Sequence, residues 1–155
     1  MSVTVALFAL VVSLVVANVS FFNGFLVKTE VDRLCNVIRY LQRCAMVENK
    51  NHVLVFDEKN QSYSFDSRTY KLSKQVTFGF LSGAKGPPSK PSKAIDKSIT
   101  FKDAKIICYS DGIIQSGMVY ITDAAKKNMY AISCAVAKVS YVRIYKFNKK
   151  WTLLS

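Results

Sequence analysis

The first 27 residues of the chain contain no charged side chain, and charge begins only at Lys28. As an α-helix, which rises about 1.5 Å per residue, residues 2–27 would reach roughly 39 Å, more than the roughly 30 Å hydrocarbon core of a bilayer. The polar side chains in this stretch are small and uncharged, so each can hydrogen-bond to its own helix or to a neighbouring one. Residues 1–27 are therefore predicted to be a membrane-spanning helix.

The helical pattern continues beyond the uncharged stretch as a single apolar stripe. Steps of four and three residues join its members, which are Val27, Val31, Leu34, Ile38, Leu41 and Ala45. Gly24 is the one weak helix former on the way, and it costs only about 1 kcal/mol relative to alanine. We therefore expect one continuous helix, whose amphipathic half (about 28–47) packs on the rest of the chain through Val31, Leu34, Ile38, Leu41 and Ala45.

The pattern changes after residue 51 to short β-branched and aromatic runs separated by polar turns, which is typical of β-strands. The predicted strands are residues 52–56, 61–65, 70–72, 75–81, 94–101, 105–109, 114–122, 127–136 and 139–147. Residues 82–93 hold all three prolines and are predicted to form a loop. The chain after the helix is long enough for one small domain.

These features predict an α+β fold, in which a long N-terminal helix packs against an antiparallel β-sheet head. The soluble part is then residues 28–155, with its β domain at about 52–155. In the last predicted strand, Tyr141, Arg143 and Tyr145 alternate with Val142 and Ile144. One face of this strand is basic and aromatic, and we expect the other, aliphatic face to cover the helix stripe.

The chain is strongly basic, with 22 Lys and Arg against 10 Asp and Glu and a formal net charge of +12. Such a charge favours polyanions or anionic lipid as partners, although it also serves solubility. The candidate nucleic-acid-binding residues are the cations and aromatics of the last strands, namely Arg143, Lys146, Lys149, Lys150, Tyr145 and Trp151. Cations among aromatic rings suit a surface that follows a phosphate backbone and stacks bases. A solvated positive face explains the same residues without a ligand.

The sequence offers little to catalysis. His52 is the only histidine, which excludes a histidine metal cluster, and we interpret it as an ordinary surface or edge residue. Asp57 and Glu58 are adjacent, so a strand would send them to opposite faces. We predict no enzyme activity, no cofactor, no metal and no small-molecule substrate.

The four cysteines form no Cys-x-x-Cys pair. Cys35 and Cys44 are nine positions apart and would lie on opposite faces of the helix, so they cannot bridge each other. Cys108 and Cys134 fall in predicted strands and could pair if those strands are neighbours. Four reduced, mostly buried thiols are the favoured alternative.

The order of these elements resembles the type IV pilin and pseudopilin superfamily. Three stretches resemble the minor pseudopilins of the GspH/FimT type: residues 2–7 the start of the mature helix, residues 33–45 the end of that helix, and residues 106–121 a strand, an Asp-Gly turn and a strand opened by Ser-Gly. The family's prepilin leader, and the glutamate five residues into its mature chain, are not among these 155 residues. Either they precede Met1 or the chain is not processed in the usual way.

The resemblance implies a structural subunit that assembles into a type II secretion pseudopilus or a type IV pilus-like filament. Its partners would be other pilin-like subunits, met through the N-terminal helix. It would sit in the inner membrane as a single-pass protein with a periplasmic head. A DNA-binding minor pilin acting in DNA uptake is the alternative. Because the basic residues follow the span, their charge alone would leave the head in the cytoplasm, which is a third possibility.

Overall fold

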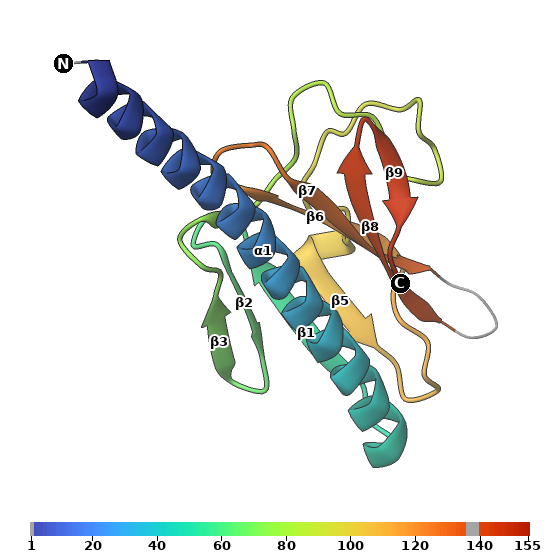
Figure 1. Cartoon of the computed structure of the whole chain (residues 1–155). Coiled ribbons are helices and arrows are strands. Elements are labelled where there is room, and N and C mark those ends of the chain that lie inside the picture. Colours follow the sequence, from blue (N-terminus) through green and yellow to red (C-terminus); the bar gives the residue numbers. More distant parts are fainter. Residues whose placement is uncertain (1, 136–139) are drawn as a thin grey trace.

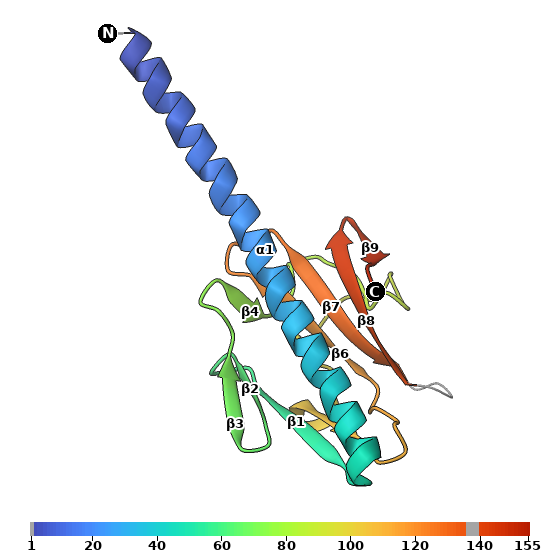
Figure 2. The same ribbon diagram turned by 60° about the horizontal axis from the view of Figure 1, so that its bottom comes forward.

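One helix dominates the computed structural model, which describes residues 2–135 and 140–155. Helix α1 (Ser2–Glu48) runs without a break, and its first half projects away from the strands while its second half lies across them (Figures 1 and 2). The predicted passage of the uncharged segment into the striped segment as one helix is confirmed.

The strands form two antiparallel sheets. Their bounds are β1 His52–Asp57, β2 Ser62–Phe65, β3 Arg68–Lys71, β4 Val76–Phe78, β5 Lys105–Cys108, β6 Gly117–Asp123, β7 Met129–Ala135, β8 Tyr141–Asn148 and β9 Lys150–Leu153, with a short 3₁₀ turn at Lys102–Ala104. The first sheet has the order β3-β2-β1-β5 and the second β4-β6-β7-β8-β9, and α1 contacts both. The predicted α+β class is confirmed, whereas the expectation of one sheet is wrong.

The first sheet ends at a point where a side chain of α1 accepts hydrogen bonds from the segment between β3 and β4. The Glu30 carboxylate of α1 accepts hydrogen bonds from the Ser73 backbone N–H at 3.3 Å and from the Ser73 hydroxyl at 2.5 Å. A backbone donor that bonds to a helix side chain cannot extend a strand ladder. The chain therefore turns at Ser73 and opens the second sheet at Val76.

The strand predicted at residues 94–101 is wrong, because another strand already occupies part of the edge it would join, and only residues 98–100 reach the remainder, through backbone hydrogen bonds to Met118 and Tyr120. β4 covers the outer edge of β6 from Ile121 to Asp123. The predicted segment keeps two isolated bridges, one between Ile99 and Val119 of β6 and one between Ala94 and Lys85. The rest of residues 94–101 continues the proline-containing loop.

The end of the chain forms a strand that the sequence did not predict. Lys149 has a φ of 59° and makes a tight turn, after which β9 pairs with β8 from Lys150 to Leu153. The predicted strands 127–136 and 139–147 correspond to β7 and β8, while Val136 and Val139 lie outside the described residues.

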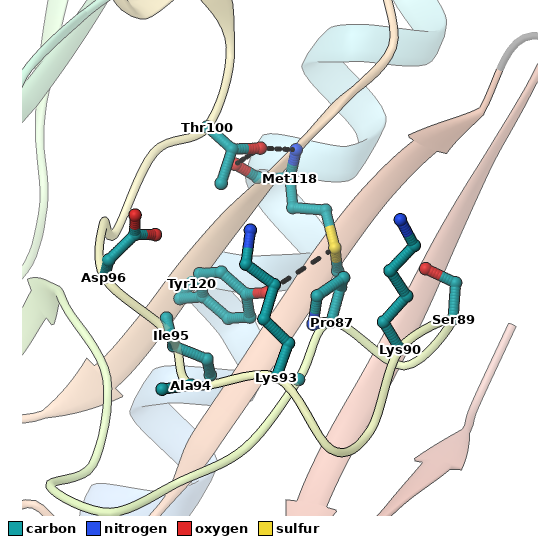
Figure 3. Close-up of a pocket in the computed structure, with 11 residues that line it drawn as sticks. Pro87, Ser89, Lys90, Lys93, Ala94, Ile95, Asp96, Thr100, Met118 and Tyr120 are labelled. Atoms are coloured by element: carbon teal, nitrogen blue, oxygen red, sulfur yellow. Dashed lines mark hydrogen bonds between the residues drawn. The ribbon is translucent and has the colours of Figure 1, made fainter.

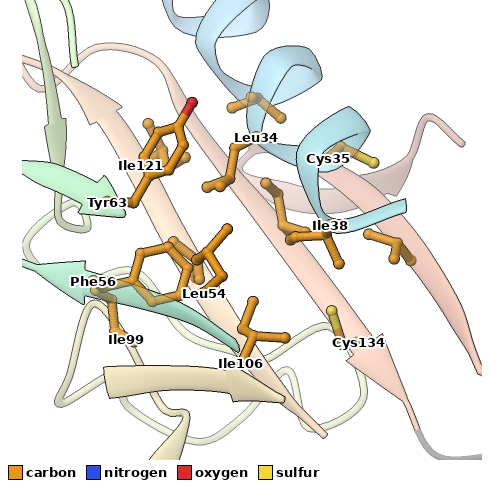
Figure 4. Close-up of a cluster of buried hydrophobic side chains, with 14 of the residues drawn as sticks. Leu34, Cys35, Ile38, Leu54, Phe56, Tyr63, Ile99, Ile106, Ile121 and Cys134 are labelled. Atoms are coloured by element: carbon orange, nitrogen blue, oxygen red, sulfur yellow. The ribbon is translucent and has the colours of Figure 1, made fainter. Parts of the chain in front are cut away.

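The main core lies between the second half of α1 and the two sheets. Val27, Val31, Leu34, Ile38, Leu41 and Ala45 are each 0% exposed. Figure 4 shows Leu34 and Ile38 above Leu54 and Ile106, side chains of the first sheet. From β8, Val142 and Ile144 are buried in the same cluster. A second, smaller cluster lies around Tyr120 and Met129 and includes Phe147 and Trp151.

Candidate functional site

The first half of α1 is an apolar surface with almost no protein around it. Its large side chains are exposed by about half or more, namely Val3, Val5, Leu7, Phe8, Leu10, Val11, Val12, Leu14, Val15, Val16, Val19, Phe21, Phe22 and Phe25. Water-soluble monomers rarely expose a contiguous apolar surface of this size. Among the described residues, α1 is the one helix long and apolar enough to cross a membrane.

The head touches this apolar half through the turn between β6 and β7. Asp123 shapes the turn, since its carboxylate accepts hydrogen bonds from the backbone N–H groups of Lys127 and Asn128 at 2.7 and 2.9 Å. A pocket of about 240 Å³ between turn and helix is lined by Val15, Val16, Val19, Asn23, Asp123, Ala125 and Lys127. Gly24 lies opposite Asn128, where a methyl group would be in van der Waals contact with the Asn128 side chain. The turn therefore sits beside residues 15–24 of the uncharged segment.

The candidate nucleic-acid-binding residues share neither one face nor one end of the head, since Arg143 lies near the start of β8 and Lys149 and Lys150 lie at the turn that follows it. Along β8, the exposed Arg143 lies on the face opposite the buried Val142 and Ile144. The Arg143 guanidinium is 4.2 Å from the centroid of the Tyr141 ring. Lys146 lies on the helix-facing side, where its ammonium is 5.8 Å from the centroid of the Tyr130 ring. The pleat of β8 thus separates Arg143 from Lys146.

Trp151 and Tyr145 are packed within the head. The Trp151 indole N–H donates to the Lys85 carbonyl at 2.8 Å. Its ring centroid lies 5.0 Å from that of Phe147 and 5.9 Å from that of Tyr120, and Tyr145 packs on the same cluster. The sequence pattern alone does not distinguish a tryptophan that packs within the head from one that is available to a ligand. In the structure, the contacts of Trp151 are with residues of the head.

Beside Trp151 lies a groove between the proline-containing loop and the β8–β9 hairpin. It has a volume of about 530 Å³ and is lined by Gly83, Lys85, Pro88, Pro91, Phe147, Lys149, Lys150 and Trp151. Lys149 and Lys150 are exposed. The groove presents ammonium groups beside an apolar wall, an arrangement that suits a ligand with a negatively charged group.

A smaller pocket of about 320 Å³ lies under the same loop (Figure 3). The Tyr120 hydroxyl faces the Met118 sulfur at 3.6 Å, and Lys90 and Lys93 stand at the rim. Burial raises the pKa of Tyr120 to about 12, with a smaller contribution from the negative charge of Asp96. Tyr120 therefore stays protonated at neutral pH and acts as a packing residue.

His52 is not the surface or edge residue that the sequence suggested. β1 lies between β2 and β5, and His52 is 9% exposed. Its Nε2 is 3.0 Å from a Glu48 carboxylate oxygen, and its Nδ1 is 3.5 Å from Asp66. His52 thus joins the end of α1 to the first sheet.

All four cysteines are free thiols, so Cys108 and Cys134 do not form the bridge considered from the sequence. Cys35, Cys108 and Cys134 are buried, and Cys44 is partly exposed. Burial raises the pKa of the Cys108 thiol to about 12 and also raises that of Cys134. Among residues 2–135 and 140–155, no group of three His, Cys, Asp or Glu side chains could hold a metal ion.

Comparisons with known proteins bear on the fold. No family model matches the sequence, and no curated protein matches it. Among solved structures, the chain is similar to the minor pseudopilin EpsH from the type 2 secretion system of Vibrio cholerae, with a TM-score of 0.54 and 10% sequence identity. The match covers 76% of this chain and 94% of that chain. The predicted pilin-like fold is confirmed by this likeness.

Proposed function

We propose that this chain is a membrane-anchored minor pilin-like subunit, which assembles into a type II secretion pseudopilus or a type IV pilus-like filament. The observation that carries the proposal is the division of α1 into two unlike halves. The stripe from Val27 to Ala45 is 0% exposed, whereas the large apolar side chains from Val3 to Phe25 are exposed by about half or more. A soluble structural role would leave the first half without a partner.

The first half of α1, whose apolar side chains from Val3 to Phe25 are exposed, is called the bare half below. It suits two successive environments. In a bilayer its apolar side chains face lipid, and the helix satisfies its own backbone hydrogen bonds. In a filament the same side chains pack against the helices of neighbouring subunits, and the small residues among them permit close approach. Anchoring and assembly thus use one surface in turn.

This function places the protein in the inner membrane as a single-pass subunit with its head outside the cytoplasm. Its partners are other pilin-like subunits, which meet it through α1. The likeness to a minor pseudopilin supports the role through the fold. The proposed work is structural, without a cofactor or a substrate to be turned over.

Membrane anchoring is tested by placing charges on the bare half of α1. Leu10→Arg with Leu14→Arg puts two cations on side chains that are 61% and 56% exposed. Each arginine at the centre of a span costs about 2.5–3.5 kcal/mol, so the double variant should leave the membrane fraction after carbonate extraction. The matched control, Leu153→Arg with Leu154→Arg, changes two exposed leucines of the head and should remain in the membrane.

Assembly is tested in the native host with a photo-reactive amino acid at Leu10. The expected products are lipid adducts before assembly and adducts with another pilin-like subunit when filaments are present. If the chain is retained in the membrane but yields only lipid adducts while filaments form, the assembly role is refuted. If both double-arginine variants stay in the membrane, the anchor is refuted.

DNA uptake is the second candidate, and the groove lined by Lys85, Lys149 and Lys150 favours it. Because Trp151 is packed internally, such binding would rest on phosphate contacts and not on base stacking. Three phosphate contacts predict that log K falls with log salt at a slope of about −2.7. Binding of the full chain in detergent to duplex DNA, with Lys149→Glu and Lys150→Glu as the variant, measures this slope. A flat salt dependence or an unaffected variant would remove the DNA-binding role.

A further inference from the structure

The strand registers bring two lysine-bearing turns to one end of the second sheet. Met129, the first residue of β7, pairs with Phe147 near the end of β8. The β6–β7 turn, with Lys126 and Lys127, therefore lies at the same end as the β8–β9 turn, with Lys149 and Lys150. In both views of the ribbon these turns lie toward the projecting half of α1 (Figures 1 and 2).

A third loop joins the same end. The Ala124 backbone N–H donates to the Gln75 carbonyl at 2.9 Å, which ties the β3–β4 loop and its Lys74 to the β6–β7 turn. We refer to Lys74, Lys126, Lys127, Lys149 and Lys150 as the lysine end of the head. All five are exposed.

The lysine end carries charge that the head itself does not neutralise. Within the described residues, none of its five ammonium groups forms an ion pair with a carboxylate. The acidic side chains nearby are used elsewhere: Asp123 holds its own turn, Asp32 pairs with Lys28, and Glu30 bonds to Ser73. The Lys126 ammonium donates one hydrogen bond, to the Phe80 carbonyl at 3.4 Å, and has further donors left over. The charge of all five lysines can therefore meet an external anion.

The position of the lysine end relative to the apolar segment limits what that anion can be. The β6–β7 turn lies beside residues 15–24 of α1, inside the stretch without charge that ends at Val27. The turn lies beside Val19, which is about 12 Å before Val27 along the helix axis. A bilayer that covers the uncharged stretch as far as Val27 therefore extends to the level of the turn. Lysine side chains at that level extend toward lipid headgroups while their stems lie on apolar surface.

We infer that the lysine end rests on anionic phospholipid headgroups while the subunit is anchored. This inference relies on the membrane anchor proposed above and adds a second contact with the bilayer, made by the head. The charged headgroups hold the head against the membrane surface. The lysine-lined groove beside Trp151 then faces lipid, and it becomes available to other anions only when the subunit leaves the bilayer.

The chain contains its own reporter for this contact, because its single tryptophan, Trp151, follows Lys150 directly. The experiment places the full chain in nanodiscs of phosphatidylcholine, with or without phosphatidylglycerol, each carrying a headgroup spin label that quenches nearby fluorescence. Stronger quenching of Trp151 is expected in the anionic discs, and added salt should reduce it. Each lysine near an anionic surface should change the ratio of docked to undocked heads about fivefold.

Two variants and a matched control separate the lysine end from net charge. Neither Lys126 nor Lys127 lines the groove beside Trp151, and Lys126→Glu with Lys127→Glu should reduce the quenching in anionic discs to the level in neutral discs. Lys149→Glu with Lys150→Glu should do the same. Arg43→Glu with Lys50→Glu makes an equal charge change at the far end of α1, on exposed side chains, and should leave the quenching unchanged.

The outcomes distinguish this inference from the function on which it relies. If the chain inserts into the discs but quenching is equal with and without phosphatidylglycerol, the lysine end does not bind anionic lipid. If all three double variants reduce quenching alike, the effect is one of net charge and the inference is also overturned. Failure of the unmodified chain to insert would instead refute the membrane anchor.

Discussion

Leu34→Ala tests whether the second half of α1 holds the head together. Leu34 is 0% exposed and lies in the main core between the helix and both sheets. Leu10→Ala is the matched control, because it is the same substitution in the same helix at a side chain that is 61% exposed. The two variants differ in packing and not in chemistry.

The size of the effect follows from the burial of Leu34. Leucine to alanine removes three carbon atoms, and at about 0.8 kcal/mol for each buried methylene the lost transfer free energy is about 2.4 kcal/mol. The cavity left behind raises the total, since buried leucine-to-alanine changes cost about 2–5 kcal/mol. We expect about 3–4 kcal/mol, equivalent to a fall of about 10–15 °C in the unfolding midpoint for a domain of this size.

The assay is equilibrium unfolding of the full chain in detergent micelles, followed by the fluorescence of Trp151. This residue belongs to the second cluster, so it reports unfolding of the sheet and not a local change beside residue 34. Leu34→Ala should lower the free energy of unfolding by the expected amount, and Leu10→Ala should leave it unchanged. Equal effects of the two variants would show that α1 does not pack on the head as described.

Three further predictions concern single residues. Burial alone would raise the pKa of Asp123, but hydrogen bonds from Asn128 and Lys127 outweigh it and hold the pKa below 3.8. The stability contributed by this carboxylate is therefore full above about pH 4 and is lost as pH falls through the lowered pKa. Asp123→Asn should accordingly flatten the dependence of the unfolding midpoint on pH in that acid range. With a thiol reagent, the native chain should show one fast thiol, and Cys44→Ser should abolish it, because Cys35, Cys108 and Cys134 are buried; several fast thiols would contradict the packing. Gly24→Ala should stabilise the protein by up to about 1 kcal/mol, because the added methyl group fits beside Asn128. Gly117→Ala should destabilise the protein, because the added methyl group would lie 2.5 Å from the buried Phe101 ring. Thermal unfolding of the two variants tests this difference, and equal shifts in the unfolding midpoint would refute it.

The helix could be predicted from the sequence because its determinants are local. The uncharged run and the spacing of Val31, Leu34 and Ile38 repeat with the period of one helix. The division into two sheets could not be predicted, because it involves contacts between distant residues, such as the hydrogen bond between Glu30 and Ser73, which are 43 residues apart. The failed strand at residues 94–101 has the same kind of cause, since β4 occupies the β6 edge from Ile121 to Asp123 and leaves only its first part to residues 98–100.

The candidate site was predicted in part. Lys149 and Lys150 lie together at the β8–β9 turn, whereas Arg143 lies near the start of β8 and on the opposite face from Lys146. The alternation of faces along a strand was available in the sequence. The packing of Trp151 on Phe147 was not, because it requires β9 to fold back on β8. Lys126 and Lys127 were missed as neighbours of Lys149 and Lys150, although their shared end follows from the antiparallel pairing of β7 with β8, two strands that the sequence did predict.

The unbroken course of α1 has an angular consequence for assembly. An α-helix turns by about 100° per residue, and Ser2–Glu48 contains no joint at which a rotation could be absorbed. The direction in which the head faces around a filament axis is therefore set by the phase of the apolar half against its neighbours. Inserting or deleting a single residue between the two halves would swing the whole head by about 100° while moving it by only about 1.5 Å along the axis.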